Sequence, residues 1–531
     1  MRDFHKPGRS AIYASDGAAA TSHPLATVAA LDCLKAGGNA IDAAITASAV
    51  LAVVEPAMTG IGGDCFVLLS KGGSDDIIAY NGNGAAPLKA EPGYFQERGI
   101  TEITPDSVHA VTVPGAIEAW CRLAADHGTF GIDRLLRPAI HYAEAGFPVA
   151  PRVAHDWAQE EENLRRDPAA AGSYLVDGHA PRLGDKIRLP LLAKTLREIA
   201  TKGAAGFYQG WVAEDMASSM AAQGGLHALE DFARHKGDYV KPIATDYEDV
   251  KLWECPPPGQ GLTALLMLNI LKAYGTQHAG SDPLGADRLH LQLEAAKLAY
   301  RERNAHIADP AFAKVSVDGL LSEFHAKALA GMIKADKALD LGAVGQFPKH
   351  PDTIYLTVVD RDRNAVSFIN SVYYGFGSGR MAPKSGVLMQ NRGACFVVDP
   401  QHPNCIGPGK RSMHTIIPAM VTKGGKAVMP YGVMGGDYQP VGQVHALTNM
   451  LDYGMDPQAA LDCPRAFYDE GTYLVEAGIP AATVQSLSAR GHKVQLSEDP
   501  LGGGQAIWID WQRGVLIAGS DPRKDGCALG Y

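Results

Sequence analysis

Two hydroxyl side chains, those of Thr353 and Ser371, lie at the outer ends of neighbouring strand-like segments. The segments, Thr353–Asp360 and Ala365–Val372, are rich in Val, Ile, Thr, Tyr and Phe, and three polar residues separate them, which is the pattern of a β-hairpin. A loop centred on Asp362 would bring the two hydroxyls to one face, about 5 Å apart at Cβ. This register makes three same-face pairs: Val358 with Val366, Leu356 with Phe368, and Thr353 with Ser371.

A threonine hydroxyl could attack a carbonyl in such a site. It is a weak nucleophile at neutral pH and needs a base within hydrogen-bond reach. If the peptide bond before Thr353 were cut, the new α-amino group, whose pKa is about 7.7 to 8.0, could take the proton without any histidine. The plainer interpretation is that Thr353 is a β-branched residue at the start of a strand.

The composition of the 531-residue chain limits the kinds of protein it can be. Hydrophobic residues make up 46% of the chain, enough for a large core, and the formal net charge is −10. This acidic excess argues against nucleic acid and acidic membranes as partners. The N-terminus has no apolar run of signal-peptide length, and no apolar span of membrane length follows. We therefore expect a cytoplasmic protein that acts on a small molecule.

No metal and no cofactor are expected. The eight cysteines have no CxxC spacing, the histidines are dispersed, and there is no HExxH motif. The glycines of Gly60–Gly63 follow no clear strand and precede no βαβ unit, so they do not indicate a dinucleotide site.

The segments around the hairpin mix helices and strands. Ser22–Val54 predicts two helices with Ser22 as a candidate cap, and Val113–Leu341 is mainly helical. Gly386–Val398 reads as a strand. Further strand-like pieces are Pro242–Thr245, Lys251–Glu254, His492–Leu496, Gly504–Trp511 and Gly514–Ala518.

Several motifs resemble one family. A threonine precedes a strand of the form hLSVVDxDGNAVS and an FGSG turn, here Thr353, Tyr355–Ser367 and Phe376–Gly379. Other matching segments run in order along the chain: GGNAIDAAI from Gly37, GIGGDCF from Gly60, VPG from Val113, PPPGQG from Pro256, MGGD from Met434, DYGMDPQAALDCPR from Asp452 and AGSDPRKDG from Ala518. The chain resembles the γ-glutamyltranspeptidase family over nearly its whole length.

This resemblance implies a proenzyme with an N-terminal nucleophile. The Thr353 hydroxyl would attack the carbonyl of Asp352, and hydrolysis of the ester would leave a large chain, residues 1–352, and a small chain, residues 353–531. The two are expected to stay associated as one intertwined domain. The implied fold is an α/β (α+β) αββα sandwich, in which two stacked antiparallel sheets are flanked by helices.

The resemblance also implies catalytic roles. Thr353 supplies the nucleophile and the base, and Ser371 orients the hydroxyl. Gly435 and Gly436 match a glycine pair whose N–H groups form an oxyanion hole, because glycine lets the backbone approach the intermediate without a Cβ in the way. A tight turn is the plainer interpretation of the pair.

On the substrate side, two charged groups of γ-glutamyl-specific relatives are replaced. Asn83 matches an arginine that binds the substrate carboxylate, and Cys395 matches an aspartate that holds its amino group. Asn83 as a turn residue, Arg411 as a surface cation and Cys395 as a structural cysteine are the plainer interpretations. The residues expected to face the substrate are Asn83, Asn391, Arg392, Arg411 and Ser412.

The expected function is that of an amidohydrolase or acyltransferase that cleaves a γ-glutamyl or related small acyl amide through an acyl-threonine. The segments NRGACF and GKRSMHT resemble the branch that includes oxamate-type amidohydrolases and cephalosporin-type acylases, and these are the alternatives. A non-catalytic small-molecule binding protein on the same scaffold is the alternative from another class.

Overall fold

The predicted hairpin lies at the centre of the fold. The computed structural model describes His5 and residues 8–341 and 351–531. β10 (Pro351–Val359) and β11 (Ala365–Tyr374) pair antiparallel. Val358 lies opposite Val366 and Leu356 opposite Phe368, so the predicted register is confirmed over most of the hairpin.

The register changes at Thr353. Asp352 pairs with Tyr373, whereas Ile354 pairs with Asn370, so two residues of β11 face the single residue Thr353. The regular pairing predicted for Thr353 is therefore wrong, because a β-bulge interrupts the ladder there. Bulges of this kind increase the local twist and re-aim a side chain.

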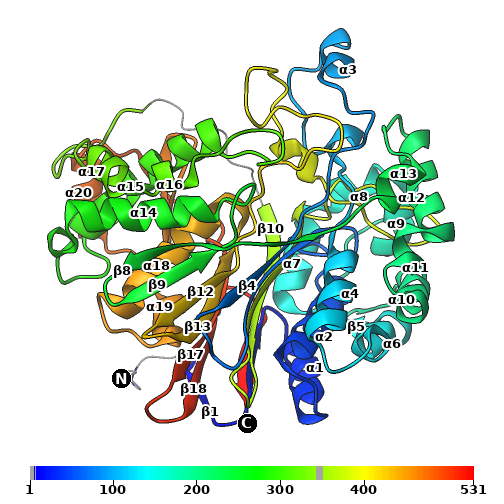
Figure 1. Cartoon of the computed structure of the whole chain (residues 1–531), viewed down its shortest axis with the longest axis horizontal. Coiled ribbons are helices and arrows are strands. Elements are labelled where there is room, and N and C mark those ends of the chain that lie inside the picture. Colours follow the sequence, from blue (N-terminus) through cyan, green and yellow to red (C-terminus); the bar gives the residue numbers. More distant parts are fainter. Residues whose placement is uncertain (1–4, 6–7, 342–350) are drawn as a thin grey trace.

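Two seven-stranded antiparallel sheets are stacked face to face in the middle of the molecule (Figure 1). The first has the order β1 (Ile12–Ala14), β18 (Val515–Ser520), β17 (Gly503–Asp510), β13 (Lys426–Met434), β12 (Ala419–Lys423), β9 (Val250–Glu254) and β8 (Ile243–Tyr247). The second has the order β19 (Cys527–Gly530), β2 (Ala18–Thr21), β10, β11, β3 (Asp64–Ser70), β4 (Ile77–Gly82) and β7 (Asp238–Val240).

Helices cover the outer faces of both sheets (Figure 1). The second sheet is covered by α1 (Pro24–Lys35), α2 (Ala40–Val54), α4 (Ala116–His127), α5 (Ile132–Leu135), α6 (Arg137–Ala145), α10 (Pro190–Lys202), α11 (Ala205–Tyr208) and α12 (Gly210–Ala222). The first is covered by α14 (Gly261–Tyr274), α15 (Ala286–His306), α16 (Val317–Leu320), α17 (Glu323–Ala330), α18 (Gln439–Leu451) and α19 (Pro457–Asp462). The αββα arrangement is confirmed.

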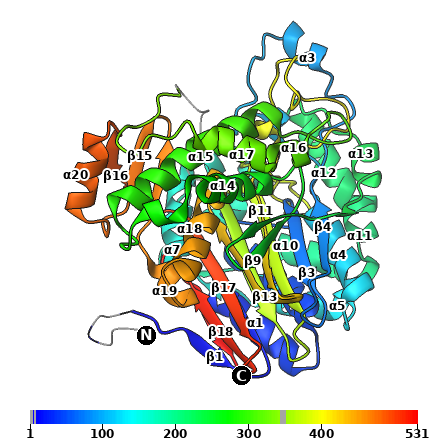
Figure 2. The same cartoon turned by 60° about the vertical axis from the view of Figure 1, so that its left-hand side comes forward.

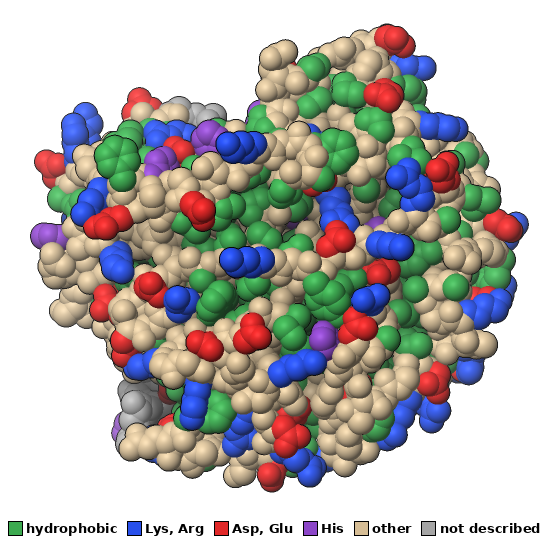
Figure 3. All heavy atoms as spheres, viewed as in Figure 1, with side chains coloured by type: hydrophobic (Ala, Val, Ile, Leu, Met, Phe, Trp, Pro, Cys, Tyr) green, Lys and Arg blue, Asp and Glu red, His purple; other side chains and the backbone are tan. Residues whose placement is uncertain are grey.

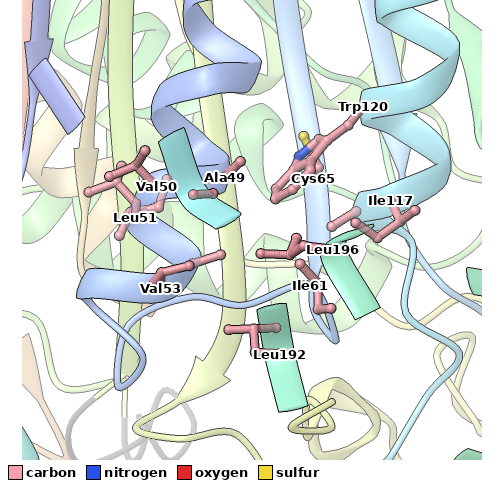
Figure 4. Packing of buried hydrophobic residues seen from close by; sticks show 14 of the residues in the cluster. Ala49, Val50, Leu51, Val53, Ile61, Cys65, Ile117, Trp120, Leu192 and Leu196 are labelled. Carbon is pink, nitrogen blue, oxygen red and sulfur yellow. The ribbon is translucent and has the colours of Figure 1, made fainter. Parts of the chain in front are cut away.

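The core on the α2 side is dense and apolar. All fifteen residues of α2 are buried, so this helix is enclosed on every side. Figure 4 shows Trp120 of α4 beside Cys65 of β3, with Ala49 and Val53 of α2 and Leu196 of α10 in the same buried cluster. This packing makes a rigid support for the hairpin strands that lie beneath α2.

A smaller three-stranded sheet lies at one end of the molecule (Figure 2). It consists of β14 (Ala466–Asp469), β15 (Thr472–Val475) and β16 (Val494–Leu496), with α20 (Ala481–Ala489) between the last two. The remaining elements are β5 (Phe147–Pro148), β6 (Lys186–Ile187), α3 (Pro92–Glu97), α7 (Pro151–Gln159), α8 (Glu161–Arg165), α9 (Pro168–Tyr174) and α13 (Leu229–Ala233).

The surface is charged, as expected for a chain with many Lys, Arg, Asp and Glu residues. Acidic and basic side chains are interspersed over the face seen in Figure 3. Within the described part of the chain, no helix has the length and apolar character needed to cross a bilayer.

Two local predictions are wrong. The segment Gly386–Val398 forms a loop with a short 3-10 turn at Arg392–Cys395 rather than a strand, because its amides bond to separate loops: Gln390 N–H donates to Gly62 O at 3.0 Å. The cap of α1 is His23, not Ser22, and the Ser22 hydroxyl bonds to the Glu55 carboxylate at the far end of α2.

Candidate active site

The bulge brings the two predicted hydroxyls together. Thr353 Oγ1 donates a hydrogen bond to Ser371 Oγ at 3.1 Å, and both residues are buried. The Ser371 oxygen also accepts from the Tyr373 N–H at 2.9 Å and from Arg392 Nη2 at 3.2 Å. Tyr373 has a φ of 87°, a strained conformation for a residue with a side chain, and this turns its N–H back toward Ser371. The Thr353 hydroxyl is thereby held by a fixed partner.

Arg392 is a fully buried cation beside this pair. Its Nη1 donates to Thr415 Oγ1 at 2.7 Å, and its guanidinium lies 4.2 Å from the centre of the Tyr373 ring. The planar Arg392 guanidinium donates to Ser371 and Thr415 from two nitrogens and also faces the Tyr373 ring. A lysine ammonium, which is a single point charge, could not make all three contacts.

Gly435 and Gly436 directly follow β13 and adopt conformations that favour glycine. Their φ values are +123° and +53°, and a Cβ on Gly435 would lie 3.1 Å from Gly502 Cα. Buried contacts hold the turn: Gln260 Nε2 donates to Gly436 O at 2.9 Å, and Asp437 is ion-paired with Arg303. Among the described residues, neither glycine N–H donates to a protein acceptor. Two such donors can receive the oxyanion of a tetrahedral intermediate.

Thr353 and Gly435 line one cavity of about 640 Å³. The end of β14 and the loops after β14 and β16 contribute acidic side chains to the lining, including Asp469, Glu470 and Glu498. Arg152 and Lys524 contribute cations elsewhere on the lining. The candidate nucleophile and one candidate oxyanion donor thus share a cavity large enough for a small amide.

Four of the five predicted substrate-facing residues are buried, and none of the five is among the described residues that line the Thr353 cavity. Asn83, Arg392 and Ser412 are buried and adjacent: Asn83 Nδ2 donates to Ser412 O at 3.1 Å, and Ser412 Oγ donates to Arg392 O at 3.4 Å. Asn391 ties loops together, because its Nδ2 donates to Gly377 O at 2.9 Å and to Pro105 O at 3.1 Å.

Arg411 is not brought to Thr353. Its Nη1 lies 2.6 Å from Asp238 Oδ2, its Nη2 donates to Lys236 O at 2.7 Å, and it lines a separate cavity of about 290 Å³. The expectation that it faces the same acyl group as Thr353 has no support in this geometry. Its partners lie on β7 and the segment before it, which local sequence around Arg411 does not reveal.

Sequence reasoning missed Asp64. This residue lies opposite Ser371 across β3 and β11, and its Oδ1 accepts from the N–H groups of Gly84 and Gly115, each at 3.0 Å. Burial raises its pKa to about 6, and the Arg392 cation opposes that rise. Near neutral pH the carboxylate is therefore the buried counter-charge of Arg392. The sequence did offer a signal for Asp64, because it is an acidic residue within the glycine-rich segment GIGGDCF.

His414 completes this buried group. Its Nε2 lies 3.1 Å from Asp64 Oδ2, and its Nδ1 accepts from the Ile416 N–H at 3.2 Å. Burial, reinforced by the Arg392 cation, holds the pKa of His414 well below its usual range. The neutral ring therefore donates its Nε2–H to Asp64.

A family model and two relatives match this chain over nearly its whole length. The family model described as Gamma-glutamyltranspeptidase matches residues 26–531. A glutathione hydrolase-like YwrD proenzyme of Bacillus subtilis is 38% identical over 519 residues, which cover 96% of this chain and 97% of that protein. An oxamate amidohydrolase proenzyme of Klebsiella pneumoniae is 36% identical over 536 residues, which cover 98% of this chain and 100% of that protein.

A solved structure is similar over the whole fold. The crystal structure of cephalosporin acylase from Bacillus halodurans aligns with a TM-score of 0.92 and 40% identity, covering 100% of this chain and 99% of that one. The chain is therefore an amidohydrolase or acyltransferase of the γ-glutamyltranspeptidase family.

Proposed function

We propose that Thr353 is the nucleophile of this enzyme and that it hydrolyses a small acyl amide. The observation that carries the proposal is the Thr353 hydroxyl, held 3.1 Å from Ser371 Oγ in the cavity that Gly435 also lines. Ser371 orients the hydroxyl, and Gly435 and Gly436 bind the oxyanion.

Maturation uses the same hydroxyl. Thr353 Oγ adds to the carbonyl carbon of Asp352, the C–N bond to Thr353 breaks, and the nitrogen takes the hydroxyl proton. Water then hydrolyses the ester, which frees the Asp352 carboxyl group and a Thr353 that has both α-amino and hydroxyl groups. The products are residues 1–352 and residues 353–531.

Turnover repeats this chemistry on an external amide. The free α-amino group of Thr353 takes the hydroxyl proton as Oγ attacks the substrate carbonyl, and the developing O⁻ meets the N–H groups of the glycine pair. The leaving amine takes the proton, and an acyl ester remains on Thr353. Water hydrolyses the ester, or an amine accepts the acyl group.

The acyl group is proposed to be small and not strictly γ-glutamyl. Asn83 and Cys395 replace two charged groups that bind a γ-glutamyl zwitterion, and asparagine cannot grip a carboxylate in the bidentate way of arginine. Asn83, Arg392 and Ser412 are the proposed acyl-facing residues because Asn83 and Ser412 match acyl-binding positions of the family and Arg392 Nη2 lies 3.2 Å from Ser371 Oγ. Relatives named for oxamate and cephalosporin chemistry support this range of substrates. A γ-glutamyl substrate is the second candidate, favoured by the glutathione hydrolase-like relative.

Mass spectrometry of the purified protein tests the proposal directly. We expect two chains, the smaller beginning with Thr353, and hydrolysis of oxamate or a glutaryl amide in preference to γ-glutamyl-p-nitroanilide. Thr353→Ala should abolish both cleavage and hydrolysis, whereas a binding protein would keep its ligand affinity. An intact 531-residue wild-type chain would overturn the proposal. Cytoplasmic residence stays a prediction.

A further inference from the structure

A buried lysine in the Thr353 cavity has few partners. The side chain of Lys524 is only 5% exposed and lines the cavity with Thr353 and Gly435. Its ammonium lies 3.8 Å from the Met58 thioether and 3.7 Å from Asp156 Oδ2. Sulfur is a weak acceptor and 3.7 Å is too long for a hydrogen bond. Within the described part of the chain, no oxygen accepts a hydrogen bond from this ammonium.

The nearest carboxylate is already engaged. Asp156 Oδ1 accepts from Arg152 Nε at 2.7 Å, so one carboxylate serves two cations. Glu55 also acts on Lys524 electrostatically, but it accepts a hydrogen bond from Ser22, and burial keeps much of it protonated near neutral pH. A buried ammonium with three donors and no dedicated acceptor is costly unless a ligand supplies one.

The side chains on both sides of Lys524 are bonded to other parts of the fold. Arg523 donates to Glu476 Oε1 at 2.7 Å and to Leu461 O at 2.8 Å. Asp525 accepts from the N–H groups of Arg152 and Val153, at 2.8 and 3.1 Å, at the start of α7. Lys524 lies between these anchors, so its position is set before any ligand arrives.

The stem of Lys524 passes along the strand end that leads to the glycine pair. A Cβ on Gly503 would lie 2.8 Å from Lys524 Cγ and 3.4 Å from its Cε, so only a glycine leaves this path open. Gly503 pairs directly with Met434, the residue before Gly435. The lysine thus runs beside the proposed oxyanion site.

We propose that Lys524 binds a carboxylate of the substrate, so that the enzyme selects amides that carry a negative charge. This inference rests on the proposed function of Thr353. It adds a specificity residue outside the buried set formed by Asn83, Arg392 and Ser412. The carboxylate lies either on the acyl part of the amide or on its amine part, and substrates of both kinds separate the two cases.

The test measures the ratio of kcat/KM for an anionic amide to kcat/KM for a neutral one. Wild type and Lys524→Met are compared on glutaryl-p-nitroanilide, which has an acyl carboxylate, on neutral butyryl-p-nitroanilide, and on butyryl-p-aminobenzoate, which has the charge on the amine. Methionine keeps the stem and removes the charge. We expect kcat/KM for one anionic substrate to fall at least about 30-fold relative to the neutral one. The affected substrate identifies the side that bears the carboxylate.

A matched control changes another cation of the same cavity. Lys493→Met removes an exposed ammonium from the lining, and we expect the anionic-to-neutral ratio to change less than about threefold. Equal ratios in wild type and Lys524→Met would overturn the inference. A wild type that is neither cleaved nor active on any of the three amides would instead contradict the proposed function.

A second measurement needs no variant. If Lys524→Met does not fold, inhibition of the wild-type enzyme by glutarate is compared with inhibition by its neutral diamide. A competitive inhibition constant at least about tenfold lower for the dianion supports the inference. Equal constants for this pair and for p-aminobenzoate against p-aminobenzamide, which carry the difference in charge on the amine part, overturn it.

Discussion

At the residue scale, the Thr353–Ser371 hydrogen bond indicates that one residue reacts and the other orients it. In the proposed mechanism, Thr353 Oγ1 forms the acyl ester, and Ser371, which accepts from the Tyr373 N–H and from Arg392, fixes the rotamer of Thr353. An orienting group of this kind acts on the rate of the chemical step more than on substrate binding, because a misplaced nucleophile loses its near-attack geometry.

Ser371→Ala tests this role. We expect kcat to fall about 100-fold with a much smaller change in KM, and self-cleavage to slow in parallel. Steady-state kinetics and the time course of chain cleavage are the measurements. Ser367→Ala is the matched control: Ser367 is also buried on β11, and its hydroxyl bonds to Tyr355 rather than to Thr353. Loss of activity in the control alone would contradict the assignment.

Gly435→Ala tests the oxyanion site at the end of β13. The φ of +123° and the 3.1 Å approach to Gly502 Cα do not suit an alanine, so the turn should shift and its N–H groups should leave the oxyanion. We expect kcat to fall about 10² to 10³-fold. Gly425→Ala, in the β12–β13 turn, is the control: it has φ +78° but open space around the added Cβ. It should lose some stability and keep kcat, and equal kcat losses in both variants would count against the oxyanion role.

At the scale of elements, the end of α2 carries a pH-sensitive group. Burial raises the pKa of Glu55 from 4.5 to about 7, while the Ser22 hydrogen bond and Lys524 oppose that rise. The carboxyl group also lies at the negative end of the helix dipole. Because the folded-state pKa is raised, its contribution to stability is present below pH 4.5 and is lost as the pH rises through 7.

Glu55→Gln should remove this pH dependence. The variant and the wild type should differ least in stability near pH 5, and the variant should gain relative to the wild type up to pH 8, by about 3 kcal/mol at most. Tm measured against pH checks this. Glu97→Gln, at a side chain that is 80% exposed, is the control and should leave the profile unchanged. A constant difference between Glu55→Gln and wild type from pH 5 to 8 would rule out titration of Glu55.

At the scale of the whole molecule, the two proposed chains share both sheets. β11 and all but the first two residues of β10, from the small chain, lie between β2 and β3, from the large chain. In the other sheet, β12, from the small chain, pairs with β9, from the large chain. Separating the chains would break backbone ladders and expose the core between the sheets. Each seven-stranded sheet therefore behaves as one cooperative unit after cleavage.

Cleavage should consequently leave one particle. We expect residues 1–352 and 353–531 to co-elute in size-exclusion chromatography at the size of the uncleaved Thr353→Ala protein, and to separate only in denaturant. Chains that part in native buffer would contradict the shared-sheet argument.

Local sequence was sufficient for the hairpin, the register of most of its pairs and the closeness of Thr353 to Ser371. Side-chain alternation and turn composition act over some twenty residues, so they can be read directly. The αββα fold and the family followed from ordered motifs along the chain.

Tertiary structure alone decided the rest. The bulge at Thr353, Asp64 opposite Ser371, the pairing of Arg411 with Asp238 and the few partners of Lys524 all depend on which distant segments become neighbours. The cost of burying a charge is set by its surroundings in space, which residues hundreds of positions away supply. The sequence by itself determined the chemistry available at Thr353, and the packed sheets determined which charges surround it.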